Sequence, residues 1–282
     1  MYTSRTVQLP GQNSNSYVAN PFIYSLEDKR EGGQKYALCL YDCQGGLFTQ
    51  SEIGEANNIF HKSLLDNDFL FFLYDPTQHA GCIRDYADKN NRDIWIVDET
   101  MDTRNRKIDK SKLTHTEQKS LNNDLLDEKS NLVLNSVKDY IEKYDTESGL
   151  VKNGKYTRLL YVIVTKCDEW GVCLSDEVQQ SLKTPPTTDE QGRVTVRKVS
   201  DEVERWIDQH DQEFVSAVKG FAKNYIYVPV SATGRKVVVR ETKVKDEITK
   251  DEGYYVGVEP LNPCWVDIPF LHAFFLRGEN GL

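Results

Sequence analysis

Residues 159–168 read Leu-Leu-Tyr-Val-Ile-Val-Thr-Lys-Cys-Asp, and this stretch decides the fold class. Residues 159–164 form a continuous apolar run of strand length, which is typical of a strand buried on both faces in a parallel sheet. The run stops at a polar tetrapeptide, Thr165-Lys166-Cys167-Asp168. In parallel sheets ligands bind beyond the carboxyl ends of the strands. The stretch therefore predicts a buried strand that carries polar residues to a binding edge.

Two similar apolar runs lie on either side of this one in the sequence. Residues 69–74 end in Asp75 before Pro76, and residues 225–230 end in Ser231-Ala232-Thr233-Gly234. Helical spacing separates the runs, at residues 116–144 and at about 201–223. Alternating strands and helices predict right-handed βαβ units. We expect an α/β fold in three layers, a mostly parallel sheet with helices on both faces.

Hairpins and insertions complete the expected fold. Apolar segments 21–27 and 36–41 around Gly32-Gly33 predict an antiparallel hairpin at the sheet edge. Segments 237–242 and 254–258 predict a second, exposed hairpin, and residues 266–276 a last amphipathic helix. Residues 51–65 also read as a helix. The charged segment at about 84–115 and the Pro-, Thr- and Gly-containing segment at about 183–198 are expected as insertions, with a loop at 183–193.

The tetrapeptide Thr165–Asp168 has the form (N/T)KxD, directly after a predicted buried strand. A carboxylate there can accept hydrogen bonds from N1–H and the exocyclic amine of guanine, a pair of donors that adenine does not present. The stem of Lys166 can pack over the base while its ammonium stays near solvent. The structural alternative is that Asp168 caps a helix N-terminus.

The segment Ser231-Ala232-Thr233-Gly234 follows the last predicted strand. Its small residues leave room for a base, and backbone N–H groups there can reach a purine carbonyl oxygen. A loop that simply needs small residues is the structural alternative.

Asp42-Cys43-Gln44-Gly45 has the form DxxG and follows the second hairpin strand. An Asp at a strand end can hold a magnesium-bound water, and a Gly lets its backbone N–H approach a terminal phosphate. A strand that ends in Asp and a Gly turn is also common without such a role.

The order DxxG, TKxD and SATG resembles the translation-factor-like branch of the P-loop GTPases. Segments 40–48, 72–78 and 164–168 are similar to bacterial GTPases of the double-GTPase type, and 260–275 resembles the end of that family. The resemblance implies a G-domain-like fold that binds GTP or GDP with Mg²⁺. It places Thr165, Lys166 and Asp168 on the guanine, Ser231, Ala232 and Thr233 behind the base, Gly45 at the γ-phosphate, and Asp42 at the magnesium through water.

The sequence departs from this family at its phosphate loop. No GxxxxGK(S/T) occurs, and the nearest string, residues 11–16, contains no Lys. We expect a single GTPase-like domain over residues 1–282, with the first strand, the phosphate loop and the first helix upstream and absent. Gly46 stands where Ras-type proteins carry the water-positioning Gln, so the neighbouring Gln44 is the candidate catalytic residue.

The amino-acid composition argues against several classes of binding partner. The chain carries 35 Lys and Arg against 44 Asp and Glu, a net charge of −9, which argues against a general binder of nucleic acids or anionic membranes. The longest apolar runs are too short to cross a bilayer. The six cysteines include no CxxC pair, which argues against a zinc site or a disulfide framework. The N-terminus carries no secretory signal, so a cytoplasmic location is expected.

Three functional interpretations remain open at this point. The favoured one is a GTP-binding, GTP-hydrolysing regulatory domain, a fragment or loop-less form with impaired nucleotide binding; whether it is an enzyme stays open. The main alternative is a nucleotide-free pseudo-GTPase that binds protein partners as a scaffold. In the third, an unrelated α/β enzyme carries the three motifs by coincidence.

Overall fold

The computed structural model describes residues 22–27, 35–40, 68–89, 127–144, 149–187, 189–234, 238–244, 247–255 and 261–280. The chain divides into two compact units, Met1–Asn67 and Asp68–Leu282, which are taken here separately. The expectation of a single domain over the whole chain stays a prediction.

The first unit contains the predicted N-terminal hairpin. Strands β1 (Phe22–Glu27) and β2 (Lys35–Leu40) pair antiparallel, with Phe22 opposite Leu40 and Glu27 opposite Lys35. The hairpin itself is therefore confirmed, and its place at the edge of a larger sheet stays a prediction. Asp42, Gln44, Gly45 and the expected helix at 51–65 lie outside the described residues.

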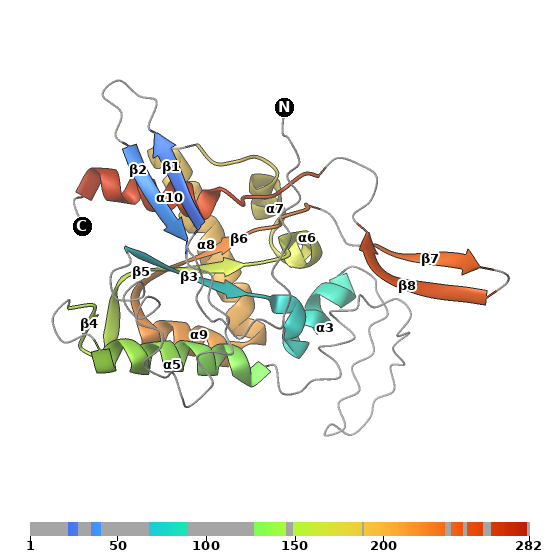
Figure 1. Cartoon of the computed structure of the whole chain (residues 1–282), viewed down its shortest axis with the longest axis horizontal. Coiled ribbons are helices and arrows are strands. Elements are labelled where there is room, and N and C mark those ends of the chain that lie inside the picture. Colours follow the sequence, from blue (N-terminus) through green and yellow to red (C-terminus); the bar gives the residue numbers. More distant parts are fainter. Residues whose placement is uncertain are drawn as a thin grey trace. The chain divides into compact units, whose positions relative to one another are not determined.

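The second unit is built on a mostly parallel sheet. Strand β5 (Lys155–Val164) lies between β3 (Phe69–Tyr74) and β6 (Ala222–Pro229) and is parallel to both. The two-residue strand β4 (Val151–Lys152) runs antiparallel to the start of β5. Val164 pairs with Tyr74 on one side and with Pro229 on the other, so the three strands end side by side (Figure 1).

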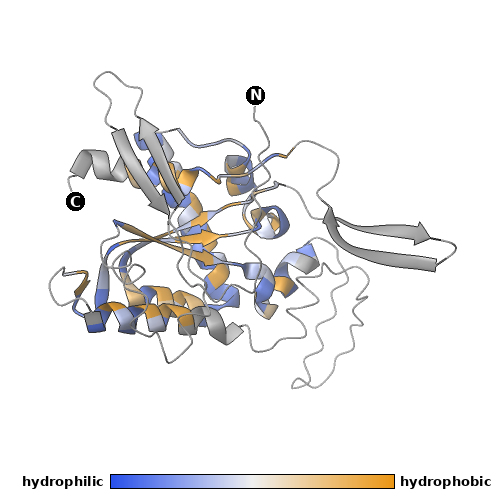
Figure 2. Cartoon of the chain, viewed as in Figure 1, coloured by the Kyte–Doolittle hydropathy of each residue, from blue (hydrophilic) through white to orange (hydrophobic). Residues whose placement is uncertain are grey.

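Helices cover both faces of this sheet. On one face, Phe72 and Tyr74 contact Phe214 of α9 (Gln212–Phe221), and α5 (Asp127–Tyr144) packs beside α9. On the other face, Phe71 contacts Phe270 of α10 (Ile268–Asn280). The strands between these helices are apolar along most of their length (Figure 2). The predicted α/β architecture, an open and mostly parallel sheet with helices on both faces, is confirmed.

Helix α8 (Glu190–His210) corrects the predicted loop at 183–193 and the predicted helix start at about 201. The β-branched and Gly residues of this segment have low helix propensity. The helix forms because Asp189 caps it, accepting from the N–H of Gly192 at 3.0 Å, and because its apolar stripe is buried. The stripe consists of Val196, Val199, Val203, Trp206 and Ile207. Tertiary burial therefore overrides local propensity here.

The predicted helix at about 201–223 is in fact two helices. Asp211 interrupts it, with φ −142° and ψ 68°, and its side chain caps α9 by accepting from the N–H of Phe214 at 3.0 Å. Strand β6 then starts at Ala222, three residues before the predicted start. A single capping residue thus separates α8 from α9, a break that the apolar spacing alone does not reveal.

Strand β3 has the predicted bounds and a different environment. It was expected to be buried on both faces, yet of its six residues only Tyr74 is buried and Leu73 is 68% exposed. Among the described residues β3 pairs with β5 alone, so it is an edge strand there. A continuous apolar run does not distinguish a central strand from a half-covered edge strand.

The remaining elements are short or stand apart. Helix α3 (Ala80–Lys89) occupies the start of the expected insertion at 84–115, of which the rest lies outside the described residues. Strands β7 (Val238–Val244) and β8 (Glu247–Tyr255) pair as a C-terminal hairpin. The hairpin was predicted, but its second strand occupies 247–255 and not the predicted 254–258. No helix in the described ranges combines the length and the apolar character that a membrane span requires.

Candidate functional site

The carboxyl ends of β3, β5 and β6 are tied together by backbone hydrogen bonds. The N–H of Thr165 donates to Tyr74 O at 2.9 Å, and that of Val230 donates to Val164 O at 2.9 Å. The N–H of Cys167 reaches back to Val230 O at 3.1 Å. The TKxD and SATG motifs therefore emerge along the same edge of the sheet, as predicted.

Thr165 makes hydrogen bonds that hold the edge of the sheet together in this structure. Its hydroxyl lies 3.3 Å from Tyr74 O, and its carbonyl accepts a 2.7 Å hydrogen bond from the indole N–H of Trp170. Trp170 is fully buried and stacks on Trp206, with ring centroids 4.8 Å apart. Thr165 therefore fixes the start of the motif, and its predicted contact with a base stays a prediction.

Lys166 is held at both its backbone and its ammonium group. Its backbone is left-handed, with φ 58° and ψ 37°, a conformation that is unfavourable for a residue with a side chain. Its Nζ lies 2.7 Å from Oδ2 of Asp75 and donates to the Thr77 hydroxyl at 3.0 Å. Lys166 thus crosses from the end of β5 to the turn after β3.

Asp168 does not cap a helix. It is the second residue of the short helix α6 (Cys167–Trp170), whose N-cap position belongs to Lys166 and has no side-chain cap bond. The side chain of Asp168 is partly exposed, and within the described part of the chain no hydrogen bond or ion pair engages its carboxylate. The capping alternative is therefore wrong, and the carboxylate is available to an external donor.

The SATG segment forms a loop closed by the chain that precedes α10. Ser231 and Cys264 exchange backbone hydrogen bonds of 3.0 and 2.8 Å, and the N–H of Asn262 donates to Thr233 O at 3.0 Å. The Ser231 hydroxyl, which is buried, accepts from the N–H of Gly234 at 2.8 Å. Ala232 is exposed, and its N–H makes no hydrogen bond within the described residues.

Gly234 is required by this loop for two separate reasons. Its φ of +64° lies in the left-handed region, and a Cβ there would fall 1.6 Å from Asn262 O. Any side chain would therefore push the loop away from the Asn262–Cys264 segment.

Two cysteines bring the two motifs into contact. Hydrogen bonding with Cys264, together with burial, raises the pKa of Cys167 well above the usual thiol value. The thiol of Cys167 donates in that hydrogen bond, and for this reason the pKa of Cys264 is lowered. The negative charge of Asp168 acts on the pKa of both thiols. The TKxD and SATG segments therefore meet at Cys167 and Cys264, the second of which is the backbone partner of Ser231.

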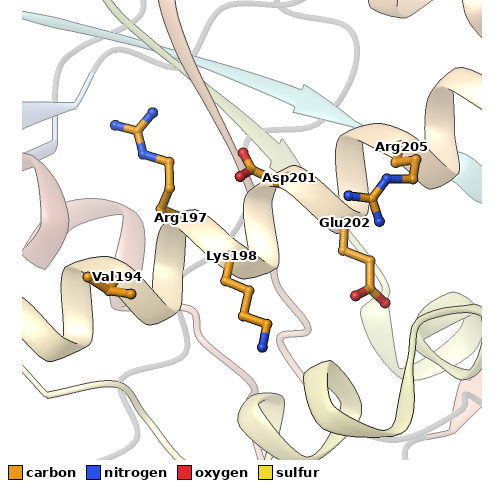
Figure 3. A pocket seen from close by; sticks show the side chains of 6 residues that line it. All are labelled: Val194, Arg197, Lys198, Asp201, Glu202 and Arg205. Carbon is orange, nitrogen blue, oxygen red and sulfur yellow. The ribbon is translucent and has the colours of Figure 1, made fainter.

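A surface pocket lies elsewhere, on the outer side of α8 (Figure 3). At this pocket Lys198 pairs with Glu177 at 2.5 Å, and the Ser175 hydroxyl donates to Glu202. The lining residues are Val194, Arg197, Lys198, Asp201, Glu202 and Arg205. None of the predicted site residues is among them.

Asp75 and the 262–264 segment were missed as parts of the site. Asp75 ends a strand in the same way as Thr165 and Ser231 do, so the sequence held a signal for it. Nothing in the sequence indicates that Cys264 pairs with Ser231, because that contact depends on the return of the chain before α10.

Asp42, Gln44 and Gly45 lie outside the described residues, and within those residues no group of three or more His, Cys, Asp or Glu is arranged to hold a metal ion. Comparisons of the chain with protein-family models, with curated proteins and with solved structures find no match.

Proposed function

We propose that the carboxyl edge of this sheet recognises a guanine base, in a GTP-binding regulatory domain whose phosphate binding is impaired. The observation that carries the proposal is the carboxylate of Asp168. It follows the central strand directly, caps nothing and pairs with nothing among the described residues. The carboxylate makes no hydrogen bond or ion pair within the described residues, and it lies at the edge where parallel sheets bind ligands. Both facts favour a role in ligand binding.

The chemistry of this carboxylate fits guanine. Guanine presents N1–H and an exocyclic amine side by side, and the two oxygens of Asp168 can accept from both. A hydrogen bond to a charged acceptor contributes about 1.5–3 kcal/mol. Adenine presents no such pair, and it would leave the carboxylate without donors.

The neighbouring groups complete a base pocket. The exposed N–H of Ala232 is free within the described residues and is a suitable donor for the purine carbonyl oxygen. The stem of Lys166 is apolar and its ammonium is anchored at Asp75, so the stem can cover a base plane. Thr165, Ser231 and Thr233 shape the pocket through their backbone and loop bonds.

The proposed domain lacks most of the groups that bind phosphates in GTPases. No GxxxxGK(S/T) supplies the N–H groups and the Lys that cradle phosphates in GTPases. We assign Asp42 to a magnesium-bound water, Gly45 to the γ-phosphate and Gln44 to the attacking water. Mg²⁺ would neutralise charge on the phosphates during water attack. Hydrolysis by this chain alone is expected to be slow or absent, and a cytoplasmic, bacterial setting fits a GTP-dependent regulator.

Asp168→Asn tests the proposal. Xanthine has a carbonyl where guanine has its amine, so the new amide should favour xanthosine nucleotides over guanosine nucleotides. Competition between GTP, XTP and ATP measures the preference of the unmodified chain and of the variant. Asp176→Asn makes the same change in the first turn of the exposed helix α7 (Asp176–Leu182) and should leave the preference unchanged. An unaltered preference in Asp168→Asn would show that the carboxylate does not read the base.

The scaffold alternative is favoured by one observation, the exposure of β3. Leu73 is 68% exposed on a strand of sequence Phe-Leu-Phe-Phe-Leu-Tyr, and such an edge favours a protein partner. Ligand-observed NMR with millimolar guanosine separates the two functions. A guanosine signal that adenosine cannot compete away supports base recognition, and the absence of any signal supports the scaffold.

A further inference from the structure

We propose that Asp75 is a positioning residue for the base site, which holds the ammonium of Lys166 so that the Lys stem is preset to cover the base. This inference rests on the proposed function and extends it to a residue outside the TKxD and SATG motifs. The ion pair between Asp75 and Lys166 is 2.7 Å long, and it joins the ends of adjacent parallel strands.

Asp75 is itself held by three further donors, which fix both of its oxygens. Oδ1 accepts from the N–H and the hydroxyl of Thr77 at 3.0 and 2.7 Å. Oδ2 accepts from the side-chain amide of Gln78 at 3.0 Å, beside Lys166. Asp75 is also the N-cap of the 3₁₀ turn η2 (Pro76–Gln78). The side chain of its partner Thr77 is buried, with only 3% of Thr77 exposed. The carboxylate is therefore a fixed anchor rather than a mobile surface charge.

Lys166 needs such an anchor to act on a base. A Lys side chain has four rotatable bonds and loses much conformational entropy when it is ordered. The side chain of Lys166 is 38% exposed, so packing alone does not order it. Its ammonium is instead fixed by Asp75 and by the hydroxyl of Thr77, before any ligand arrives. Part of the ordering is thus complete in the free protein, which is preorganisation for binding.

The division of roles between the two Asp residues follows from the chemistry. Every purine has a π-face, so a stem that covers the face strengthens the binding of guanine and xanthine alike. Asp168 faces the donors that distinguish those bases. Asp75 should therefore set the affinity, whereas Asp168 sets the preference.

The test uses the full chain, ligand-observed NMR titrations with guanosine and xanthosine, and the variants Asp75→Asn, Lys166→Ala and their double mutant. Asn is as good an N-cap as Asp, so Asp75→Asn keeps the turn while it removes the charge. We expect Asp75→Asn to weaken guanosine binding about 3- to 10-fold, the effect of leaving one long side chain to be ordered on binding. The ratio of guanosine to xanthosine affinity should not change.

The double mutant separates positioning from a general structural effect. If Asp75 acts through Lys166, the double mutant should bind guanosine as weakly as Lys166→Ala alone, since neighbouring residues in one interaction are not additive. Asp75→Glu, which restores the charge, should recover part of the lost affinity. Asp189→Asn changes the N-cap of α8 in the same way and should bind as the unmodified chain does.

The possible outcomes distinguish a failure of the proposed function from a failure of the role proposed for Asp75. If the unmodified chain shows no guanosine preference over adenosine, the proposed function fails and the inference fails with it. If that preference is present and Asp75→Asn binds as tightly as the unmodified chain, the inference alone is overturned. Additive losses in the double mutant, or a changed ratio of guanosine to xanthosine affinity in Asp75→Asn, overturn it as well.

Discussion

The hydroxyl of Tyr74 donates a 2.8 Å hydrogen bond to Oδ2 of Asp211, which joins the last residue of β3 to the cap of α9. Both residues are buried, and the ring of Tyr74 stacks on Phe214 with centroids 4.1 Å apart. Tyr74→Phe should lower the free energy of unfolding by about 1.5–3 kcal/mol, because it takes a donor from a buried carboxylate. Urea unfolding followed by circular dichroism measures the change.

Tyr227→Phe is the matched control for Tyr74→Phe. Tyr227 is fully buried too, yet its hydroxyl finds no hydrogen-bond partner among the described residues. Removing an unpaired hydroxyl should leave the stability unchanged or raise it. Equal losses in the two variants would mean that the bond to Asp211 contributes no more to stability than the unpaired hydroxyl of Tyr227 does.

His272 should make the protein less stable in mild acid. Burial, together with the positive charges of Arg197 and Arg193, lowers the pKa of His272 to about 4, and its Nδ1 lies 3.0 Å from the Tyr161 hydroxyl. The folded state therefore holds the neutral ring, whereas the unfolded chain takes up a proton near pH 6.5. The contribution of His272 is complete above about pH 6.5 and is lost as the pH falls to about 4, by up to about 3 kcal/mol.

The His272→Asn variant isolates this contribution. The Asn side chain can still face Tyr161 but does not titrate, so the unfolding free energy should fall less steeply between pH 6.5 and pH 4 than in the unmodified chain. Carboxylates titrate in the same range in both proteins, and the difference between the two curves removes their effect. Parallel curves would show that His272 is not buried as the neutral ring.

Gly234→Ala should disturb the SATG loop far more than a typical Gly→Ala change. The new methyl group would lie 1.6 Å from Asn262 O, and the backbone φ of +64° adds strain. Gly154 has a φ of +71° and open space around its Cβ position, so Gly154→Ala contains the strain without the clash. Thermal unfolding should show a larger loss for Gly234→Ala, and guanosine binding should fall in that variant alone. Similar losses of stability would place the two glycines in equivalent turns.

The affinities for guanosine, GMP, GDP and GTP should be nearly equal in this chain. A phosphate loop normally adds several charge-assisted hydrogen bonds to the phosphates, and those would raise the affinity by powers of ten from guanosine to GTP. Without GxxxxGK(S/T) the proposed base contacts dominate, and the roles assigned to Asp42 and Gly45 add little to the affinity. Calorimetry with Mg²⁺ present measures the series. Sub-micromolar binding of GTP would mean that another segment of the chain holds the phosphates.

The sheet was predictable because its signals are local. The apolar runs at 69–74, 159–164 and 225–230 became β3, β5 and β6, and the polar residue after each run lies at the carboxyl edge of the sheet. The start of α8 was not predictable from propensity, since the burial of Val196 and Val199 decides it. The exposure of Leu73 and the break at Asp211 likewise depend on neighbours that are distant in sequence.

The candidate site likewise contains residues that the sequence could predict and residues that it could not. Lys166, Asp168 and Ser231 could be proposed because their residue types follow strands at suggestive spacing. The partner of Lys166 could not, because Asp75 lies 91 residues earlier and meets it only through the parallel pairing of β3 with β5. The closeness of Gly234 to Asn262 likewise follows from the path of the chain into α10.

The bridge between Ser231 and Cys264 has a consequence for how the chain matures. Every element of the proposed base site up to Gly234 leaves the ribosome before the segment that closes the SATG loop. The anchor of Lys166 needs only β3 and β5, so it can form while synthesis continues, whereas the closing of the SATG loop waits for Asn262 and Cys264. Contacts between such distant segments form slowly. A nascent chain would therefore carry all of its sequence motifs for some time before it could bind a ligand.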